Sequence, residues 1–218
     1  MRTLLYFHDP MCSWCWAFRP VWQAIREGLP SDVRVRQLLG GLAPDTEIPM
    51  PLELRYKIRE IWMTIQRAVP GTEFNFDFWK RCTPRRSTYP ACRAVIAARR
   101  QGREFEDPMM VAIQRAYYLE ARNPSDDATL VALAGEIGLD VGWFSADLSD
   151  SGIQEELQAE IGFGRGLGVC GFPTLMMQDG EGYRSIELDY RNPSTVLTEV
   201  SNQDHIDHLA GTSQERST

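Results

Sequence analysis

The sequence lacks any apolar run long enough to cross a membrane. A transmembrane helix needs roughly 18 to 20 consecutive apolar residues. The apolar run at residues 4–7 is also far too short for the core of a signal peptide, which spans about 7 to 15 residues. We therefore expect no membrane partner, a chain that is not exported, and a cytoplasmic location.

Basic residues are too few and too dispersed for a nucleic-acid surface. The chain has 23 Lys and Arg residues against 30 Asp and Glu, a formal net charge of −7. Binding to a phosphate backbone requires clustered cations that release counterions, so we expect no nucleic-acid partner. We interpret the densest basic stretch as a solvated helix face or, alternatively, as a contact for an anion such as a glutathione carboxylate. It comprises Arg81, Arg85, Arg86, Arg99, Arg100 and Arg103.

The cysteines do not form the pattern of a disulfide framework or of a structural zinc site. There are five, an odd number, and a cytoplasmic chain keeps its thiols reduced, so we expect no structural disulfides. Structural zinc takes four ligands at short spacings. Nine residues separate Cys82 from Cys92, and His205 and His208 stand in a polar tail. We therefore expect no bound metal.

The composition is that of a packed globular protein. Apolar residues make up 43% of the 218 and aromatic residues 10%, including six tryptophans. A chain of this length forms one large domain, or a small domain that carries an inserted second one.

Apolar patterning predicts a small sheet built from two parts of the chain. The first part reads strand, helix, strand, over Arg2–His8, 12–27 (with Pro20 inside) and Val33–Leu39. This order favours a parallel pair of strands. The second part reads strand, strand, helix, over 174–178, 184–188 and a last helix that opens at Asn192 and Pro193.

Almost everything between these two parts is predicted to be helical. Thr88 precedes a helix with Pro90 in its first turn, and Gly102 and Gly138 end periodic runs. The predicted helices span 54–68, 89–102, 108–121, 127–138 and 151–166. The sequence therefore predicts an α/β fold in which a small sheet is interrupted by a helical insertion.

A C-x-x-C pair, Cys12 and Cys15, follows the first strand and opens the first helix. Two sulfurs at this spacing lie on one helical face, and Cys12 lies where backbone N–H groups lack intrahelical partners. Lowering a thiol pKa from about 8.5 to about 6 needs roughly 3.4 kcal/mol, and the helix dipole supplies only about 0.3 to 1. Hydrogen bonds must supply most of the rest. We predict that Cys12 is the redox nucleophile and that Cys15 resolves the mixed disulfide.

A second feature, Gly-Phe-Pro-Thr at residues 171–174, stands where the chain returns to the sheet. Together with the C-x-x-C and with Pro20, five residues after Cys15, it resembles the thioredoxin superfamily. The long helical insertion, with Val-Cys-Gly-Phe-Pro-Thr at its exit, resembles the DsbA family in particular. Residues 9–16, Asp-Pro-Met-Cys-Ser-Trp-Cys-Trp, are similar to a bacterial group of predicted cytosolic protein-disulfide isomerases.

The resemblance covers residues 3–202 and implies a thioredoxin-like fold interrupted by a large all-helical insertion. The implied thioredoxin-like domain consists of residues 1–41 and 168–203, and the implied insertion domain of residues 42–167. The remaining residues, 204–218, are expected to form a flexible tail.

The same resemblance implies roles for the site residues. Cys12 would be the exposed nucleophile and Cys15 the buried one. A cis-proline would face the pair and present the backbone of the preceding residue to an extended substrate segment. Substrate contacts are accordingly expected at Ser13, Trp14, Phe172 and Pro173.

The dipeptide between the cysteines and the residue before the proline both depart from the family pattern. The dipeptide between the cysteines is Ser13-Trp14, where exported oxidants have Pro-His, so no histidine is present there to hydrogen-bond the thiolate. A less oxidising pair is therefore expected. Phe172 is larger than the Val or Thr common before the cis-proline, which would narrow the groove.

The implied function is that of a thiol-disulfide oxidoreductase or protein-disulfide isomerase. It would act on protein or small-molecule thiols and disulfides and need no cofactor, with glutathione as a candidate co-substrate.

Two other classes of function remain open. Kappa-class glutathione transferases and 2-hydroxychromene-2-carboxylate isomerases resemble the same insertion architecture, but they carry serine at the nucleophile position. A glutathione-dependent isomerase or transferase of that type is the first alternative. The second is a non-catalytic partner-binding module that uses Trp14, Trp16 and Phe172 as an exposed aromatic patch.

Several further residues allow both a functional and a structural interpretation. His8 could add positive charge near the thiolate if protonated, or be a half-buried strand-end histidine. Cys170 could be a third redox thiol, although we expect a small buried side chain, and we interpret Cys82 and Cys92 as packing residues. The G-x-G-x-x-G at residues 166–171 is not preceded by a predicted strand, so we expect no dinucleotide site there.

Overall fold

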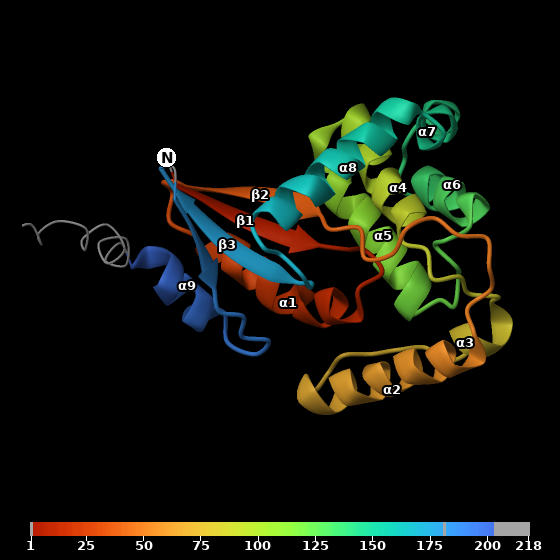
Figure 1. Cartoon of the computed structure of the whole chain (residues 1–218), viewed down its shortest axis with the longest axis horizontal. Coiled ribbons are helices and arrows are strands. Elements are labelled where there is room, and N and C mark those ends of the chain that lie inside the picture. Colours follow the sequence, from red (N-terminus) through yellow and green to blue (C-terminus); the bar gives the residue numbers. More distant parts are fainter. Residues whose placement is uncertain (1, 181, 203–218) are drawn as a thin grey trace, which may run out of the picture.

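The computed structural model describes residues 2–180 and 182–202 (Figure 1). Its sheet has the strand order β2-β1-β3-β4, with bounds Arg2–His8 for β1, Val33–Leu39 for β2, Thr174–Asp179 for β3 and Gly182–Ile186 for β4. The strands β1 and β2 are parallel, as predicted, and β3 is antiparallel to both β1 and β4. The expected flexible tail at 204–218 lies outside the described residues.

The alternating side chains of β1 separate two apolar layers. Leu4 and Tyr6 pack with residues of α1 (Ser13–Gly28) and α9 (Pro193–Ser201) on one face. Leu5 and Phe7 pack with residues at the C-terminal end of α8 (Ser151–Gly166) on the other. Because successive side chains of a strand point to opposite faces, β1 supplies the core of both layers.

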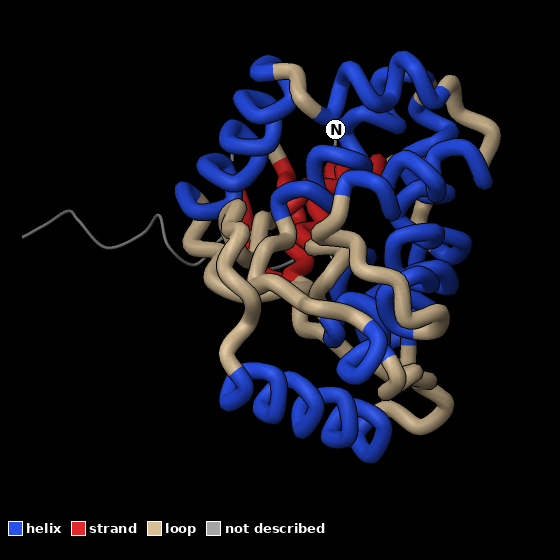
Figure 2. The backbone as a smooth tube through the Cα atoms, turned by 90° about the vertical axis from the view of Figure 1, so that its right-hand side faces the viewer, coloured by secondary structure: helices blue, strands red, loops and turns tan. Residues whose placement is uncertain are grey.

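The chain between β2 and β3 is mainly helical, as predicted. Its α-helices are α2 (Leu52–Ala68), α3 (Phe78–Arg81), α4 (Tyr89–Gln101), α5 (Glu106–Tyr118), α6 (Asp127–Glu136), α7 (Val141–Leu148) and α8, with a short 3-10 helix at Arg103–Phe105. Figure 2 shows helices on several sides of the strands, and α2 lies along the lower edge in both views. The division into domains at residues 41 and 168 stays a prediction.

The sequence missed α3 and α7 and displaced one strand. Asp140 caps α7, because its carboxylate accepts a hydrogen bond from Trp143 N at 2.8 Å, and this acidic cap before an apolar run was the available signal. The last strand lies at Gly182–Ile186 and not at 184–188. The first helix continues through Pro20 and has Cys12 as its N-cap.

The core of the insertion is an aromatic cluster centred on Trp62 of α2. This side chain is fully buried. Its ring lies 4.8 Å from that of Phe74 and 4.9 Å from that of Trp79 (centroid distances), and its indole N–H donates to Ser13 Oγ at 3.0 Å. Trp62 therefore joins the insertion to the first turn of α1.

We expect Trp62→Ala to lower the free energy of unfolding by about 3 to 5 kcal/mol, because it removes the central ring of this cluster. Chemical denaturation monitored by circular dichroism measures the change. The matched control is Trp143→Ala, whose side chain is 71% exposed and whose loss should cost within about 0.5 kcal/mol. Equal losses in the two variants would contradict the central place of Trp62.

Candidate functional site

The C-x-x-C pair lies at the end of β1, where a tight turn leads into α1. Cys12 N donates to Asp9 O at 3.0 Å, and Trp16 N donates to Cys12 O at 3.0 Å. Both cysteines are free thiols. The expected exposed nucleophile is in fact nearly covered, since Cys12 is 6% exposed and Cys15 is 1% exposed.

The segment before β3 lies against Cys12. The thiol of Cys12 donates a hydrogen bond to Phe172 O at 3.2 Å, and the Phe172–Pro173 peptide bond is cis. The predicted juxtaposition of this segment with the cysteine pair is therefore present. The sequence led us to expect that the first N–H groups of α1 would hold the Cys12 sulfur. The thiol makes no capping hydrogen bond to them, because it is turned toward the Phe172 carbonyl.

The two sulfurs are in different electrostatic environments. Burial raises the pKa of Cys15 well above its ordinary value, and the neighbouring Cys12 raises it further. Cys15 therefore holds its proton at neutral pH. Among the described residues no cationic side chain is hydrogen-bonded to either sulfur.

Asp9, which the sequence analysis did not select, holds the turn in place. This fully buried carboxylate accepts hydrogen bonds from Met11 N at 2.8 Å, Leu42 N at 2.7 Å and Thr88 Oγ1 at 2.7 Å. The thiol of Cys92 also points to it, at 3.5 Å. Burial raises the pKa of Asp9, and these hydrogen bonds oppose the shift. The available signal was an acidic residue directly between a strand and the C-x-x-C.

Ser13 and Trp14, the other two residues predicted to contact a substrate, already contact side chains of this protein. Ser13 Oγ accepts the bond from Trp62, and the half-buried Trp14 packs edge-on against Tyr190, with ring centroids 5.2 Å apart. Trp16 stacks on Tyr118 at 5.5 Å and donates to Glu73 O. The aromatic patch expected for a partner-binding module is therefore not freely exposed, and the roles of Ser13 and Trp14 stay predictions.

The structure excludes the positive charge considered at His8 and contradicts the expectation for Cys170. His8 is 3% exposed, and burial lowers its pKa to about 3, so it is neutral at pH 7 and adds no positive charge near the thiolate. Cys170 is exposed and does not pack as a small buried side chain, because it lies in the loop between α8 and β3.

The remaining cysteines pack as expected, with one addition. Cys92 is fully buried in the core of the insertion, where it also contacts Asp9. Cys82 is partly buried against the same core and donates to Ala121 O. The glycine-rich segment at 166–171 follows a helix and precedes a strand, which is the reverse of a dinucleotide-binding turn.

Three of the six arginines in the predicted basic stretch form ion pairs within the insertion. Arg99 pairs with Glu106, Glu156 and Glu160, at 3.0, 2.6 and 2.6 Å. The Glu160 carboxylate also accepts from Leu39 N at 2.6 Å and so connects α8 to β2. Arg85 and Arg100 form ion pairs too: Arg85 with Glu47 and Asp126, Arg100 with Asp147, Asp150 and Glu156. These three arginines are therefore not a vacant anion site, whereas Arg81, Arg100 and Arg103 are exposed, as expected for a solvated face.

Two kinds of feature are absent from the described ranges. No helix there is long and apolar enough to span a bilayer. Within residues 2–180 and 182–202, no three His, Cys, Asp or Glu side chains are grouped so as to hold a metal ion. His205 and His208 lie outside these ranges.

The fold and the cysteine pair define a DsbA-like member of the thioredoxin class. The sequence profile of the thioredoxin family matches residues 5–190, and the chain belongs to this family. Oxidoreductases of the DsbA type share the fold at 13 to 20% identity.

Two solved structures are more similar. One, from Nitrosomonas europaea, is described as a candidate protein disulfide isomerase; it is 29% identical, with a TM-score of 0.79, and the match covers 91% of this chain and 95% of that one. The other is the cytosolic disulfide reductase DsbM from Pseudomonas aeruginosa, 26% identical, with a TM-score of 0.71 over 85% of this chain and 89% of that one. DsbM has also been solved with GSH.

Among curated proteins, the chain is similar to the ClpXP adapter protein SpxH of Halalkalibacterium halodurans. The two are 24% identical over 199 residues, which is 89% of this chain and 64% of the relative. The SpxH of Bacillus subtilis is 26% identical over 172 residues, or 78% of this chain and 56% of the relative. The chain thus spans less than two thirds of the length of these curated relatives.

We expect His8→Gln to flatten the pH dependence of stability below about pH 6.5. The pKa of His8 is about 3 in the folded protein against 6.5 ordinarily, so unfolding takes up a proton within this window. The stability that neutral His8 contributes is fully present above the unfolded pKa of 6.5. It is lost as the pH falls toward the folded pKa of about 3, by up to about 1.4 kcal/mol per pH unit. Urea denaturation at about pH 6 and about pH 5 measures the slope. Identical slopes for the two proteins would show that His8 is not buried as a neutral ring.

Proposed function

We propose that this protein is a thiol-disulfide oxidoreductase whose redox couple is Cys12 and Cys15. The observation that carries the proposal is the contact of the Cys12 thiol with the Phe172 carbonyl, 3.2 Å away, beside a buried Cys15 of raised pKa. The Cys12 sulfur thus lies at a segment that a substrate could approach, and burial keeps the Cys15 thiol protonated. The similarity to the disulfide reductase DsbM supports the same activity.

Reduction of a substrate would proceed by two thiol-disulfide exchanges. The Cys12 thiolate attacks one sulfur of the substrate disulfide, a mixed disulfide forms, and the other substrate sulfur leaves as a thiolate that takes up a proton. Cys15 then loses its proton and attacks the sulfur of Cys12. The second substrate thiol is released, and the two electrons given to the substrate leave the protein with a Cys12–Cys15 disulfide. Oxidation is the reverse sequence.

Substrate recognition would use the backbone before β3. In the reduced protein the Phe172 carbonyl accepts a hydrogen bond from Cys12, and an extended peptide could offer an N–H in its place. Backbone pairing of this kind demands little of the substrate sequence. We propose Phe172 and Pro173 as the main contacts, with Ser13 and Trp14 beside the nucleophile.

The oxidised protein would be returned to the dithiol form by a small thiol. The similarity to a cytosolic disulfide reductase, which has also been solved with GSH, supports a cytoplasmic protein that uses glutathione as co-substrate. No prosthetic group is needed, because both electrons reside on the two sulfurs.

We expect Cys12→Ser to reduce disulfide-reductase activity to background, because no second thiolate replaces the nucleophile. Cys15→Ser should instead accumulate a mixed disulfide with the substrate, since the resolving thiol is missing. Turbidity after insulin reduction, together with mass spectrometry of the trapped adduct, measures both outcomes. Cys170→Ser, which changes an exposed thiol outside the pair, is the matched control and should retain full activity.

Wild-type activity in Cys12→Ser would refute the proposal. If glutathione conjugation or isomerisation were found that survived Cys15→Ser, the protein would be a glutathione-dependent enzyme of the kappa-class type.

We expect the pair to have a reduction potential near that of thioredoxin, about −270 mV. A stabilised thiolate makes a disulfide more oxidising, and here no histidine stands between the cysteines and burial raises the pKa of Cys15. Equilibration in glutathione buffers, followed by alkylation and mass analysis of the peptide that carries both cysteines, gives the value. A potential near the roughly −120 mV of DsbA would instead indicate an oxidant.

A second candidate function is that of a protein adapter, favoured by the similarity to SpxH over 89% of this chain. An adapter would bind its partner whether or not the cysteines are present. Pull-down of client proteins with the double variant Cys12→Ser, Cys15→Ser separates the two functions, because an oxidoreductase loses its covalent client adducts and an adapter keeps its complexes.

A further inference from the structure

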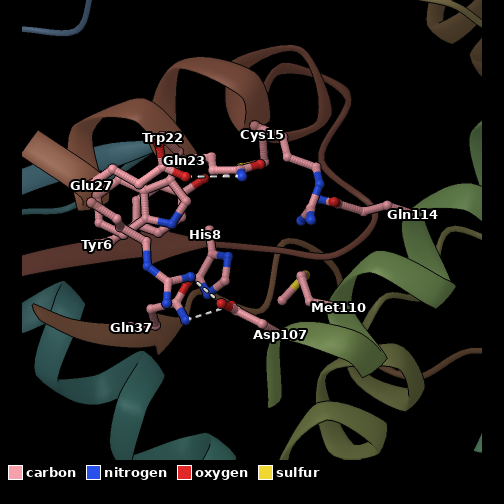
Figure 3. Close-up of a pocket in the computed structure, with 12 residues that line it drawn as sticks. Tyr6, His8, Cys15, Trp22, Gln23, Glu27, Gln37, Asp107, Met110 and Gln114 are labelled. Carbon is pink, nitrogen blue, oxygen red and sulfur yellow. Dashed lines mark hydrogen bonds and ion pairs between the residues drawn. The ribbon is translucent and has the colours of Figure 1, made fainter. Parts of the chain in front are cut away.

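A polar cavity of about 430 Å³ lies behind the cysteine pair, between the sheet and the insertion. Its walls come from α1, β1, β2 and α5. Figure 3 shows Tyr6 and Trp22 on one side, Gln114 on the opposite side, Cys15 above and Asp107 below, with His8 in the middle. The buried sulfur of the redox pair therefore forms part of the wall of a cavity that the Phe172 segment does not line.

Three buried polar atoms in this wall have no hydrogen-bond partner among the described residues. They are His8 Nε2, Trp22 Nε1 and Gln114 Oε1, and their residues are 3%, 5% and 3% exposed. Buried polar atoms nearly always have a partner, so an occupant of the cavity is expected to provide it. The indole N–H can only donate, and the amide oxygen can only accept. A matching ligand therefore carries both an acceptor and an N–H donor.

The wall of the cavity carries two cations, Arg19 and Arg26, and two acids, Glu27 and Asp107. Arg26 and Gln37 both bond to Asp107, the latter at 2.9 Å, and Gln23 bonds to Glu27 at 3.1 Å. Asp107 is therefore ion-paired with Arg26, whereas the hydrogen-bond partner of Glu27 is a neutral amide. Arg19, half-buried in the same wall, has no ion pair or hydrogen bond within residues 2–180 and 182–202. A partly buried guanidinium that makes no direct ion pair can bind a carboxylate with two parallel hydrogen bonds.

We infer that this cavity is a binding site for a small carboxylate-bearing molecule with an N–H donor, of the size of an amino acid or short peptide. Its volume lies within the range of small-ligand sites, about 300 to 1,000 Å³. The carboxylate lies at Arg19 and accepts from the indole of Trp22, and the donor group lies at Gln114. The site is argued from the cavity alone and does not depend on the proposed redox activity.

A second, smaller cavity provides an internal control. It has a volume of about 190 Å³ and is lined by Phe7, Phe172, Cys170 and Arg165. Because Phe7 points to the opposite face of β1 from Tyr6 and His8, the two cavities lie on opposite sides of that strand. Arg165, which is exposed, is thus the matched cation on the other side.

The test is a titration of the isotope-labelled protein with S-methylglutathione, which has two carboxylates and amide N–H groups but no thiol to exchange. The indole N–H resonance of Trp22, assigned by its loss in Trp22→Phe, should shift on binding. Arg19→Gln should weaken binding at least about tenfold, the effect of losing a charge-assisted contact. Arg165→Gln should leave the affinity unchanged, and the spectrum of each variant reports whether it is folded.

Several results would overturn the site. They are an unshifted Trp22 resonance at saturating S-methylglutathione and L-glutamate, weaker binding in Arg165→Gln and not in Arg19→Gln, or equal affinity for inorganic sulfate. Binding should persist in Cys12→Ser. A protein in which this variant retains reductase activity while the Trp22 shift remains would refute the proposed function and leave the site standing.

Discussion

The buried carboxylate of Asp9 is the constraint on which the redox turn depends. It accepts hydrogen bonds from the turn itself at Met11, from the loop after β2 at Leu42 and from the start of α4 at Thr88. A desolvated carboxylate is costly unless its lone pairs are occupied, so these three segments must assemble around it together. The position of Cys12 is therefore fixed by the insertion as much as by the sheet.

The aromatic cluster around Trp62 fixes the other side of the same turn. Its indole bonds to Ser13, and Tyr118 of the same cluster stacks on Trp16, so both residues that flank the Trp14-Cys15 step are attached to the insertion. Large buried rings resist displacement because each makes many contacts at once. The insertion thus covers the cysteine pair closely, and this explains why Cys12 is far less exposed than its family resemblance implied.

The sequence predicted the elements that have a strong period and clear ends. Strands β1 and β2, helix α8 and the interruption of the sheet follow from local patterning. What it could not predict depends on contacts distant in the chain. His8 is neutral because α5 and the sheet bury it. Arg99 forms an ion pair with Glu156, which lies far along the chain. Asp9 accepts a hydrogen bond from Thr88, 79 positions away in the sequence. The polar cavity beside Cys15 likewise forms only when α1 meets α5.

The hydrogen bond between Cys12 and Phe172 spans 160 positions of the chain. During synthesis the cysteine pair therefore leaves the ribosome well before the carbonyl that covers it. At roughly 5 to 20 residues per second this interval lasts on the order of 8 to 32 s. For that time the Phe172 carbonyl cannot cover Cys12, so the shielding of the nucleophile by this segment is completed only late in synthesis.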